Sequence, residues 1–183
     1  MIYPIVVAGH PVLKMKAQEI DKNFPDLDKL IEDMFETMYV SDGVGLAAPQ
    51  IGKSIRLFVI DGKPAAEDNP ELENFKKVFL NPYIIEESGE EWFFNEGCLS
   101  VPGIREDVQR KSIVKIKYFD ENWQQHEDVF DGMAARIIQH EYDHLEGTLF
   151  TDRLSFLKRK MLRGKLSDIS KGIVDVSYNI RTK

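Results

Sequence analysis

The sequence predicts an α+β fold in which largely antiparallel sheets pack around a central helix, with other helices toward the N- and C-terminal ends. Two observations carry this prediction. Helical periodicity appears in three separate segments, and the strand-like segments follow one another without regular alternation with helices. With 183 residues, of which 43% are hydrophobic, the chain has the length and apolar content for one core. We therefore expect a single domain over residues 1–183.

The first expected helix covers residues 25–39, because apolar residues recur there at steps of three and four and acidic residues come early. Four strands are expected next, at residues 55–60, 78–85, 113–118 and 123–130. Between the first two strands, residues 61–74 are rich in Pro, Asp and Glu and predict a long surface loop. The middle of the chain should therefore be mostly sheet.

Two further helices are expected toward the end of the chain. Apolar residues keep a helical spacing from Asp131 onward, and Gly147 is a typical residue just beyond the end of a helix. A basic helix is expected over residues 155–165. Its positive side chains are Lys158, Arg159, Lys160, Arg163 and Lys165.

The composition argues against several classes of protein. Asp and Glu outnumber Lys and Arg by 31 to 24, which gives a net charge of −7 and disfavours general binding to DNA. No apolar run approaches the roughly 20 residues that a membrane-spanning helix needs, and Pro4 interrupts the apolar opening, so we expect neither a membrane span nor export. The single cysteine allows no internal disulfide, which suits a reducing cytoplasm.

Residues 140–144 read HEYDH, an HExxH pattern inside the second predicted helix. Side chains four residues apart share one face of a helix, so His140 and His144 can reach the same metal ion while Glu141 handles protons beside it. The alternative is a solvated helix face that carries two histidines without a metal.

A metal site needs a third protein ligand, and two known arrangements fail. The metzincin pattern matches up to Gly147 but has Phe150 in place of its third histidine. A thermolysin-like site needs a later glutamate, and none follows Glu146. The remaining candidates are His10, His126, Asp152 and Cys98.

Cys98 lies in the segment best suited to supply that ligand. Residues 96–100 read EGCLS, where Gly97 lets a backbone come close and a thiolate is a strong ligand for zinc or ferrous iron. A lone cysteine is otherwise commonly a small buried hydrophobic residue. A third segment, residues 43–50, reads GVGLAAPQ and matches no phosphate-binding glycine motif, because no expected strand precedes it.

The segments GVGLAAPQ, EGCLS and QHEYDH, in this order, resemble the three signature motifs of peptide deformylases. The resemblance covers nearly the whole chain, because residues 4–13 and the helix before residue 43 also look like that family. It implies a single catalytic domain over residues 1–183 that works in the cytoplasm. The implied reaction is metal-dependent hydrolysis of the formyl group from N-terminal formyl-methionine of nascent polypeptides, with release of formate.

The resemblance also implies the roles of the reacting groups. Cys98, His140 and His144 bind the metal and leave its fourth position open to water. Since a bound divalent ion lowers the pKa of its water toward about 7, Glu141 can take a proton from that water and pass it to the departing amine.

The oxyanion is expected to be stabilised by the metal, by the backbone N–H of Leu99 and by the side-chain amide of Gln50. The resemblance implies that the substrate-binding residues are Val44, Gly45, Glu96, Gly97, Arg105 and Ile137. Among them Gly45, which has no side chain, can pair with an extended peptide by strand addition. Arg136 departs from the apolar pocket wall expected one turn before His140, so either its alkyl stem lines the pocket or it points elsewhere.

The resemblance suggests an ion pair between Asp143 and Arg110 behind the metal, whereas the alternative is an exposed acid near a helix end. It also implies Fe²⁺ as the metal, with Zn²⁺ and Ni²⁺ as alternatives in purified protein. The expected partners are formyl-methionyl nascent peptides. The basic helix over residues 155–165 is either a solvated face or a docking surface for ribosomal RNA.

Two other classes of function share parts of this pattern. A zinc endopeptidase also uses HExxH but cleaves internal peptide bonds and needs a longer groove. An inactive module that binds metal or formyl-peptide would keep the ligands without turnover. The presence of both Glu141 and Gln50 argues against the inactive module.

Overall fold

The computed structural model describes residues 1–183, which form three α-helices and seven strands. The helices are α1 (Leu27–Val40), α2 (Gly132–Leu145) and α3 (Phe156–Ser170). The strands are β1 (Ile5–Val6), β2 (Gly45–Ala47), β3 (Leu57–Asp61), β4 (Lys76–Glu96), β5 (Glu106–Phe119), β6 (Gln125–Asp131) and β7 (Ile180–Arg181).

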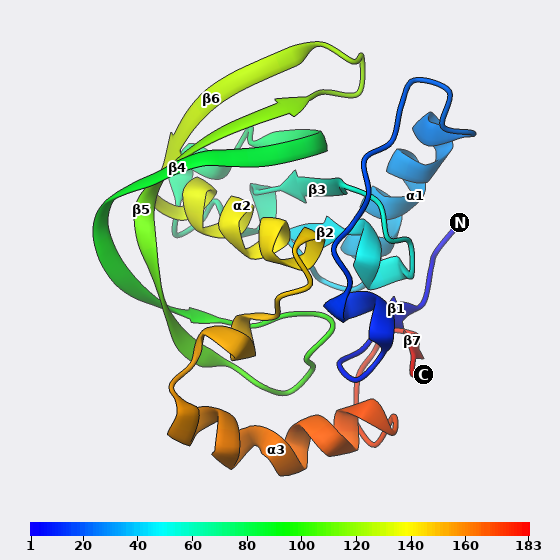
Figure 1. Ribbon diagram of the computed structural model, residues 1–183, viewed down its shortest axis with the longest axis vertical. Coiled ribbons are helices and arrows are strands. Elements are labelled where there is room, and N and C mark those ends of the chain that lie inside the picture. The colour runs from blue at the N-terminus through cyan, green and yellow to red at the C-terminus, as the bar shows by residue number, and fades with distance from the viewer.

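Five strands form one antiparallel sheet in the order β2-β3-β4-β5-β6, and β1 and β7 form a separate parallel pair. Figure 1 shows the long strands β4 and β5 curving around α2, while α3 runs along the lower side of the molecule and both termini lie close to the β1–β7 pair. Register shifts along β4 accompany this curvature, since irregular pairing lets a 21-residue strand bend. The predicted α+β class with a central HExxH helix is confirmed.

Strand β3 is apolar along nearly its whole length because both of its faces are covered. Leu57 and Val59 belong to the hydrophobic cluster that includes the buried side of α1. Phe58 and Ile60 belong to the cluster that includes the buried side of α2. The sheet between these clusters holds α2 in place, which fixes the direction in which the HExxH side chains point.

Several predicted boundaries are corrected by the structure. Strands β4 and β5 extend far beyond residues 78–85 and 113–118, because alternating polar and aromatic residues continue them as a long two-stranded ribbon. Trp123, predicted to begin a strand, lies in the turn before β6 with φ of 60°. The segment 61–74 contains two short 3₁₀ turns, and Leu72 in the second turn is fully buried, so the segment is anchored to the core rather than being a free surface loop.

None of the helices combines the length and the apolar character that crossing a membrane would require.

Candidate metal centre

Helix α2 carries the two predicted histidine ligands on one face. The ring centres of His140 and His144 lie 5.3 Å apart, as expected for side chains one helical turn apart. The helix ends at Leu145, and Gly147 follows with φ of 71°. A Cβ at Gly147 would lie 2.6 Å from the backbone oxygen of Lys14, so this close approach requires glycine.

The third side chain of the cluster is Cys98, in the loop that follows β4. Its sulfur lies 3.4 Å from Nε2 of His144. One possible ligand atom from each of Cys98, His140 and His144 lies within 4.8 Å of the other two. The chain therefore brings together residues that are more than 40 positions apart in the sequence.

The other candidates for a third ligand do not join this cluster. Nδ1 of His10 accepts a hydrogen bond from the backbone N–H of Val12. The ring of His126 pairs with Asp120 at 2.7 Å. Asp152 accepts from Lys14 and from the backbone N–H of Leu149. Cys98 is thus the candidate that converges with the two histidines.

The donor set fits a divalent transition-metal ion. One thiol and two imidazoles are typical ligands of zinc or ferrous iron. The neighbouring Oε2 of Glu141 is buried and has no hydrogen-bond partner, which is costly for a polar atom that has nothing to bind. Such an atom beside a thiol and two imidazoles is consistent with a site that receives an ion and its water.

A buried ionic network lies behind His140. Nδ1 of His140 lies 2.8 Å from Oε1 of Glu96, and Arg110 donates to both oxygens of the same carboxylate at 2.7 and 2.9 Å. Burial opposes ionisation of Glu96, but the hydrogen bonds from His140 and Arg110 hold its pKa well below its usual range. Since Glu96 is an acceptor, His140 donates through Nδ1, which leaves Nε2 as its remaining ligand atom.

The ion pair suggested for Asp143 and Arg110 is present. Arg110 Nη1 donates to Asp143 at 2.9 Å, and both side chains are buried. Arg153 donates two more hydrogen bonds to Asp143, each 2.6 Å long. Arg110 therefore connects the carboxylate behind His140 to the acid that precedes His144.

The guanidinium of Arg136 points into this network. Its Nη1 donates to Glu96 and to the backbone oxygen of Val108, each at 2.8 Å, and its Nη2 donates to the backbone oxygen of Trp92 at 2.7 Å. The guanidinium also lies 4.4 Å from the ring centre of Trp92. Of the two alternatives for Arg136, the structure thus favours the one in which its charged head lies elsewhere.

Glu141 is buried beside strand β2. Burial raises the pKa of Glu141 to about 7. A Cβ on Gly45 would lie only 2.5 Å from Oε1 of Glu141, so the absence of a side chain at Gly45 makes room for the carboxylate. The same residue pairs with Ile60 of β3 and lies in the edge strand of the sheet.

Gln50 is held in one orientation by its neighbours. Its Oε1 accepts from the backbone N–H of Ala47 at 2.9 Å, while its Nε2 lies 3.2 Å from Oγ of Ser100 and 3.5 Å from the sulfur of Cys98. The amide N–H₂ of Gln50 therefore faces the cluster formed by Cys98, His140 and His144. Leu99, next to Cys98, is half-buried, and its backbone oxygen accepts from the hydroxyl of Tyr178.

The expected substrate residues occupy different positions around the cluster. Val44 and Ile137 pack against the same hydrophobic cluster, which is consistent with one apolar wall. The guanidinium of Arg105 lies so close to Gly97 that a Cβ there would be 2.5 Å from Nη1. Glu96 differs from the others, because Arg110, Arg136 and His140 already occupy its buried carboxylate.

Sequence reasoning missed Tyr178, which comes from the segment after α3 and reaches the loop of Cys98. It also missed Phe150 as a neighbour of the site: this ring, which stands where a metzincin has its third histidine, stacks on His140 at 6.1 Å. The spacing of the three motifs carries no signal for either contact.

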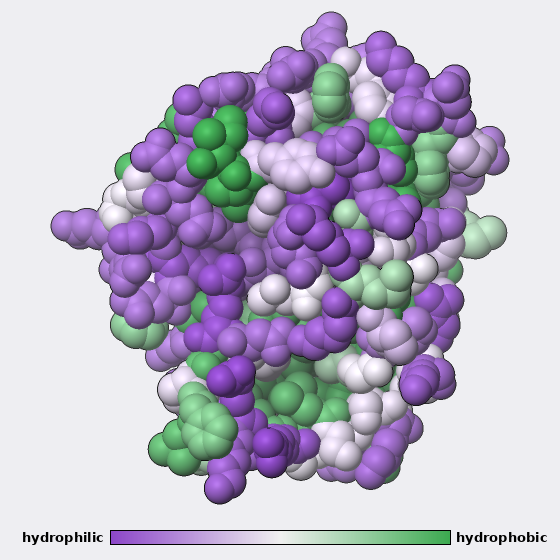
Figure 2. Space-filling view, viewed as in Figure 1, coloured by the Kyte–Doolittle hydropathy of each residue, from purple (hydrophilic) through white to green (hydrophobic).

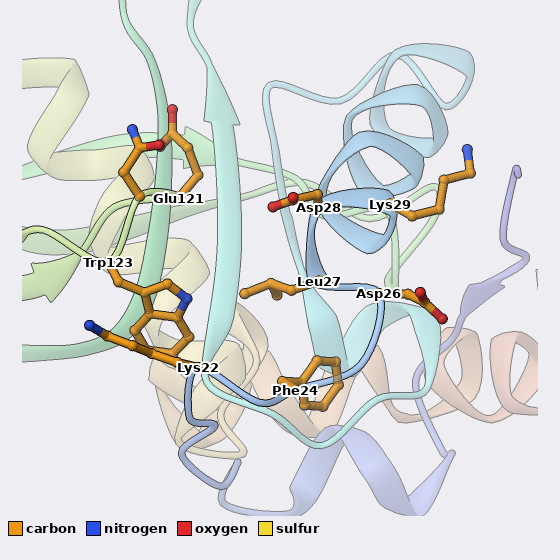
Figure 3. Close-up of a pocket in the computed structure, with 9 residues that line it drawn as sticks. Lys22, Phe24, Asp26, Leu27, Asp28, Lys29, Glu121 and Trp123 are labelled. Atoms are coloured by element: carbon orange, nitrogen blue, oxygen red, sulfur yellow. The ribbon is translucent and has the colours of Figure 1, made fainter.

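A surface pocket elsewhere contains none of these residues. Figure 3 shows it between the segment that leads into α1 and the turn before β6. Phe24, Leu27 and Trp123 supply its apolar part, and side chains of both charge signs surround them. The cluster of Cys98, His140 and His144 is therefore separate from this pocket.

The fold, together with two histidines of an HExxH helix that converge with a cysteine from a separate loop, defines a metal-dependent hydrolase. The family model described as Polypeptide deformylase matches residues 2–160. The chain belongs to the peptide deformylase family, whose members remove the N-formyl group from nascent peptides.

Individual proteins are similar over almost the whole chain. Curated peptide deformylases of Christiangramia forsetii and Cytophaga hutchinsonii are 54% and 53% identical, with 99% of this chain and 96% and 97% of the relatives covered. The crystal structure of a peptide deformylase from Legionella pneumophila is 40% identical and has a TM-score of 0.81, with 94% of this chain and 98% of that chain covered. A peptide deformylase from Synechococcus elongatus, solved in complex with actinonin, is 36% identical with a TM-score of 0.77, over 99% and 92% of the two chains.

Proposed function

We propose that Cys98, His140 and His144 hold the divalent ion at which this enzyme hydrolyses the formyl group, within a single catalytic domain formed by residues 1–183. The convergence of their ligand atoms within 4.8 Å is the observation that carries the proposal. When bound, the ion supplies Lewis-acid activation of water and of the formyl carbonyl. Glu96 fixes the ring of His140 from behind, so that Nε2 keeps its direction.

Glu141 is the proposed general base and acid. A carboxylate whose pKa is near neutral can accept a proton from water and then deliver it to the departing amine at the same pH. Its buried, unpartnered Oε2 leaves one oxygen available for this exchange.

Gln50 and the backbone N–H of Leu99 are the proposed donors to the oxyanion. Both adjoin Cys98, and the amide of Gln50 is fixed by Ala47 and Ser100 before any substrate arrives. Donors that need no reorientation stabilise a developing negative charge at little cost, which is how such groups lower a barrier.

The substrate backbone is proposed to pair with β2. This strand hydrogen-bonds only to β3, so its other edge is free to receive an extended peptide. Gly45 admits a close approach, and Val44 with Ile137 offers an apolar wall for the methionine side chain. Gly97 and Arg105 form the outer part of the site. We assign the Glu96 carboxylate to positioning His140 rather than to substrate contact.

The proposed resident metal is Fe²⁺, with Zn²⁺ and Ni²⁺ as the alternatives, since a thiolate and two imidazoles accept all three. Reconstitution without oxygen separates them: metal content and formate release are measured on the same samples. An iron form that is faster than the zinc form supports the assignment, and a faster zinc form rejects it.

Helix α3 is the proposed contact with the ribosome, in the cytoplasm. Most of its residues are exposed, and the positive charges lie beside the exposed apolar side chains of Phe156, Leu157 and Met161. Figure 2 shows hydrophobic groups among hydrophilic ones where α3 begins, at the lower left. Co-sedimentation with ribosomes should weaken with salt and with neutralisation of Arg159, Lys160 and Arg163. Binding that survives this neutralisation rejects the contact.

The deciding experiment for the proposed site is formate release from a formyl-methionyl dipeptide by metal-loaded enzyme, with Cys98→Ala and His144→Ala as variants. Loss of both bound metal and formate release in each variant supports the proposal. Cleavage of an internal peptide bond in an unformylated peptide would instead indicate an endopeptidase. Metal binding without any turnover by the unmodified enzyme would indicate an inactive binding module.

A further inference from the structure

The chain after residue 160 lies outside the part matched by the family model, yet it reaches Leu99, the residue next to Cys98. After α3 it returns to pair β7 with β1 in parallel, with Ile5 beside Ile180. The backbone N–H of Ile5 donates to Asn179 at 2.8 Å. The pairing therefore fixes Tyr178, the residue just before Asn179, relative to the core.

Tyr178 contacts the loop of Cys98 through its hydroxyl. The hydroxyl donates to the backbone oxygen of Leu99 at 2.8 Å, and the ring packs against the hydrophobic cluster that Leu99 also contacts. Burial raises the pKa of Tyr178 to about 12, so the hydroxyl keeps its proton at neutral pH. The contact is thus a stable hydrogen bond to the residue beside a proposed metal ligand.

This bond completes the fixation of the loop. The backbone oxygen of Cys98 accepts from Val101 at 2.9 Å, and that of Ser100 accepts from Ala8 at 2.8 Å. Peptide groups are planar, so holding the oxygens of Cys98 and Leu99 fixes the two peptide planes that flank Leu99. The first of these planes carries the Leu99 N–H.

The same C-terminal segment also supports the turn that carries Gln50. A Cβ on Gly52, two residues after Gln50, would lie 1.7 Å from Nη2 of Arg181 in β7. The guanidinium therefore rests directly on the backbone where this 3₁₀ turn ends. Both proposed oxyanion donors, Gln50 and Leu99, thus belong to segments held by residues 178–181.

We infer that Tyr178 is a positioning residue of the deformylase reaction: by holding the carbonyl of Leu99, its hydroxyl fixes the Leu99–Ser100 peptide plane. Through the Leu99 Cα this limits rotation of the preceding plane, which carries the Leu99 N–H that donates to the oxyanion. The inference rests on the proposed role of Leu99. Its consequence is that the catalytic site is completed by a part of the chain that lies beyond the residues matched by the family model.

The test is Tyr178→Phe in the full-length, metal-loaded enzyme, which removes the hydroxyl and keeps the ring in the core. We expect kcat for formate release to fall about fivefold, the scale of one neutral hydrogen bond, with KM changed less than about twofold. Amide hydrogen exchange at Leu99 and Ser100 should become faster, while metal content stays the same.

Tyr3→Phe is the matched control. Tyr3 is also a half-buried tyrosine on the same hydrophobic cluster, and its hydroxyl makes no hydrogen bond within the chain. We expect its kcat and its exchange rates to equal those of the unmodified enzyme. An equal loss of kcat in both variants would overturn the inference, because the effect would then come from general loosening of the core.

The remaining outcomes also separate the alternatives. Unchanged kcat and unchanged exchange in Tyr178→Phe overturn the positioning role alone, provided that the unmodified enzyme releases formate. Faster exchange with unchanged kcat overturns the proposed role of the Leu99 N–H together with this inference. A rise in KM without a fall in kcat overturns it in favour of a direct substrate contact.

Discussion

The cluster of Cys98, His140 and His144 is held on its two sides by different kinds of interaction. Behind His140, the carboxylate of Glu96 is buried among the guanidinium groups of Arg110 and Arg136. Around Cys98, the loop is held by hydrogen bonds between neutral groups, from Gln50 and Tyr178 among others. One side is an ionic network, and the other is a set of single neutral contacts.

The difference matters because the two kinds of contact respond differently to loss of one partner. Removing one member of a buried ion pair leaves an uncompensated charge and costs about 3–5 kcal/mol. Removing one neutral hydrogen bond costs about 0.5–1.5 kcal/mol. We therefore expect substitutions in the ionic network behind His140 to act mainly on the free energy of unfolding. Substitutions around Cys98 should act mainly on the rate of formate release.

The largest expected effect is the loss of kcat on removal of Glu141, which lies between the ionic network and the loop of Cys98. Glu141→Ala should lower kcat by about 10²–10⁴-fold, because no other group replaces the proton transfer. The midpoint of thermal unfolding should stay the same or rise, since a buried carboxylate oxygen without a partner is removed. Metal content is measured in parallel, and its loss would make Glu141 a ligand or a structural residue instead.

The next largest effect is expected in the ionic network behind His140. Arg110→Met should lower the free energy of unfolding by about 3–5 kcal/mol, because Glu96 and Asp143 both lose a buried partner. Urea denaturation of the metal-free proteins measures it. Lys158→Met is the control, since it removes an exposed ion pair with Glu106, and no measurable loss is expected there. Equal effects of the two substitutions would contradict the comparison.

Gln50→Ala tests the neutral hydrogen bonds around the loop of Cys98. We expect kcat/KM to fall by about 10²–10³-fold, equivalent to about 2.7–4 kcal/mol of barrier, with the metal retained. The free energy of unfolding should fall by about 1–3 kcal/mol, because Ala47 and Ser100 each lose a neutral hydrogen-bond partner. Gln109→Ala removes an exposed amide on β5 that bonds only to Glu91, and it should leave the rate unchanged. A Gln50→Ala enzyme with a near-normal rate would rule out the oxyanion role.

The smallest of these effects is expected for Arg136→Met, since Arg110 and His140 still hold Glu96 in that variant. The free energy of unfolding should fall by about 1.5–3 kcal/mol, the range for hydrogen bonds to charged groups. The KM for formyl-methionyl peptide should stay the same, because the charged head of Arg136 does not face the pocket. A raised KM at unchanged stability would show that Arg136 lines the pocket after all.

The sequence alone was sufficient to predict the fold class and to identify the candidate site residues. Helical spacing places His140, Glu141 and His144 on one turn, because a helix fixes the distance between residues four positions apart. The ordered motifs around Gln50 and Cys98 implied the rest of the set. The fold class and the shared helix face of the two histidines are confirmed, because both depend on local geometry or on a short pattern.

Only the tertiary structure determined what surrounds those groups. The direction of Arg136, the stacking of Phe150 on His140 and the hydroxyl of Tyr178 on Leu99 all join residues that no spacing rule connects. Such contacts depend on how β4 bends and on how the chain returns after α3 to pair β7 with β1. Their positions are set by long-range packing, and a local pattern of residues carries no information about it.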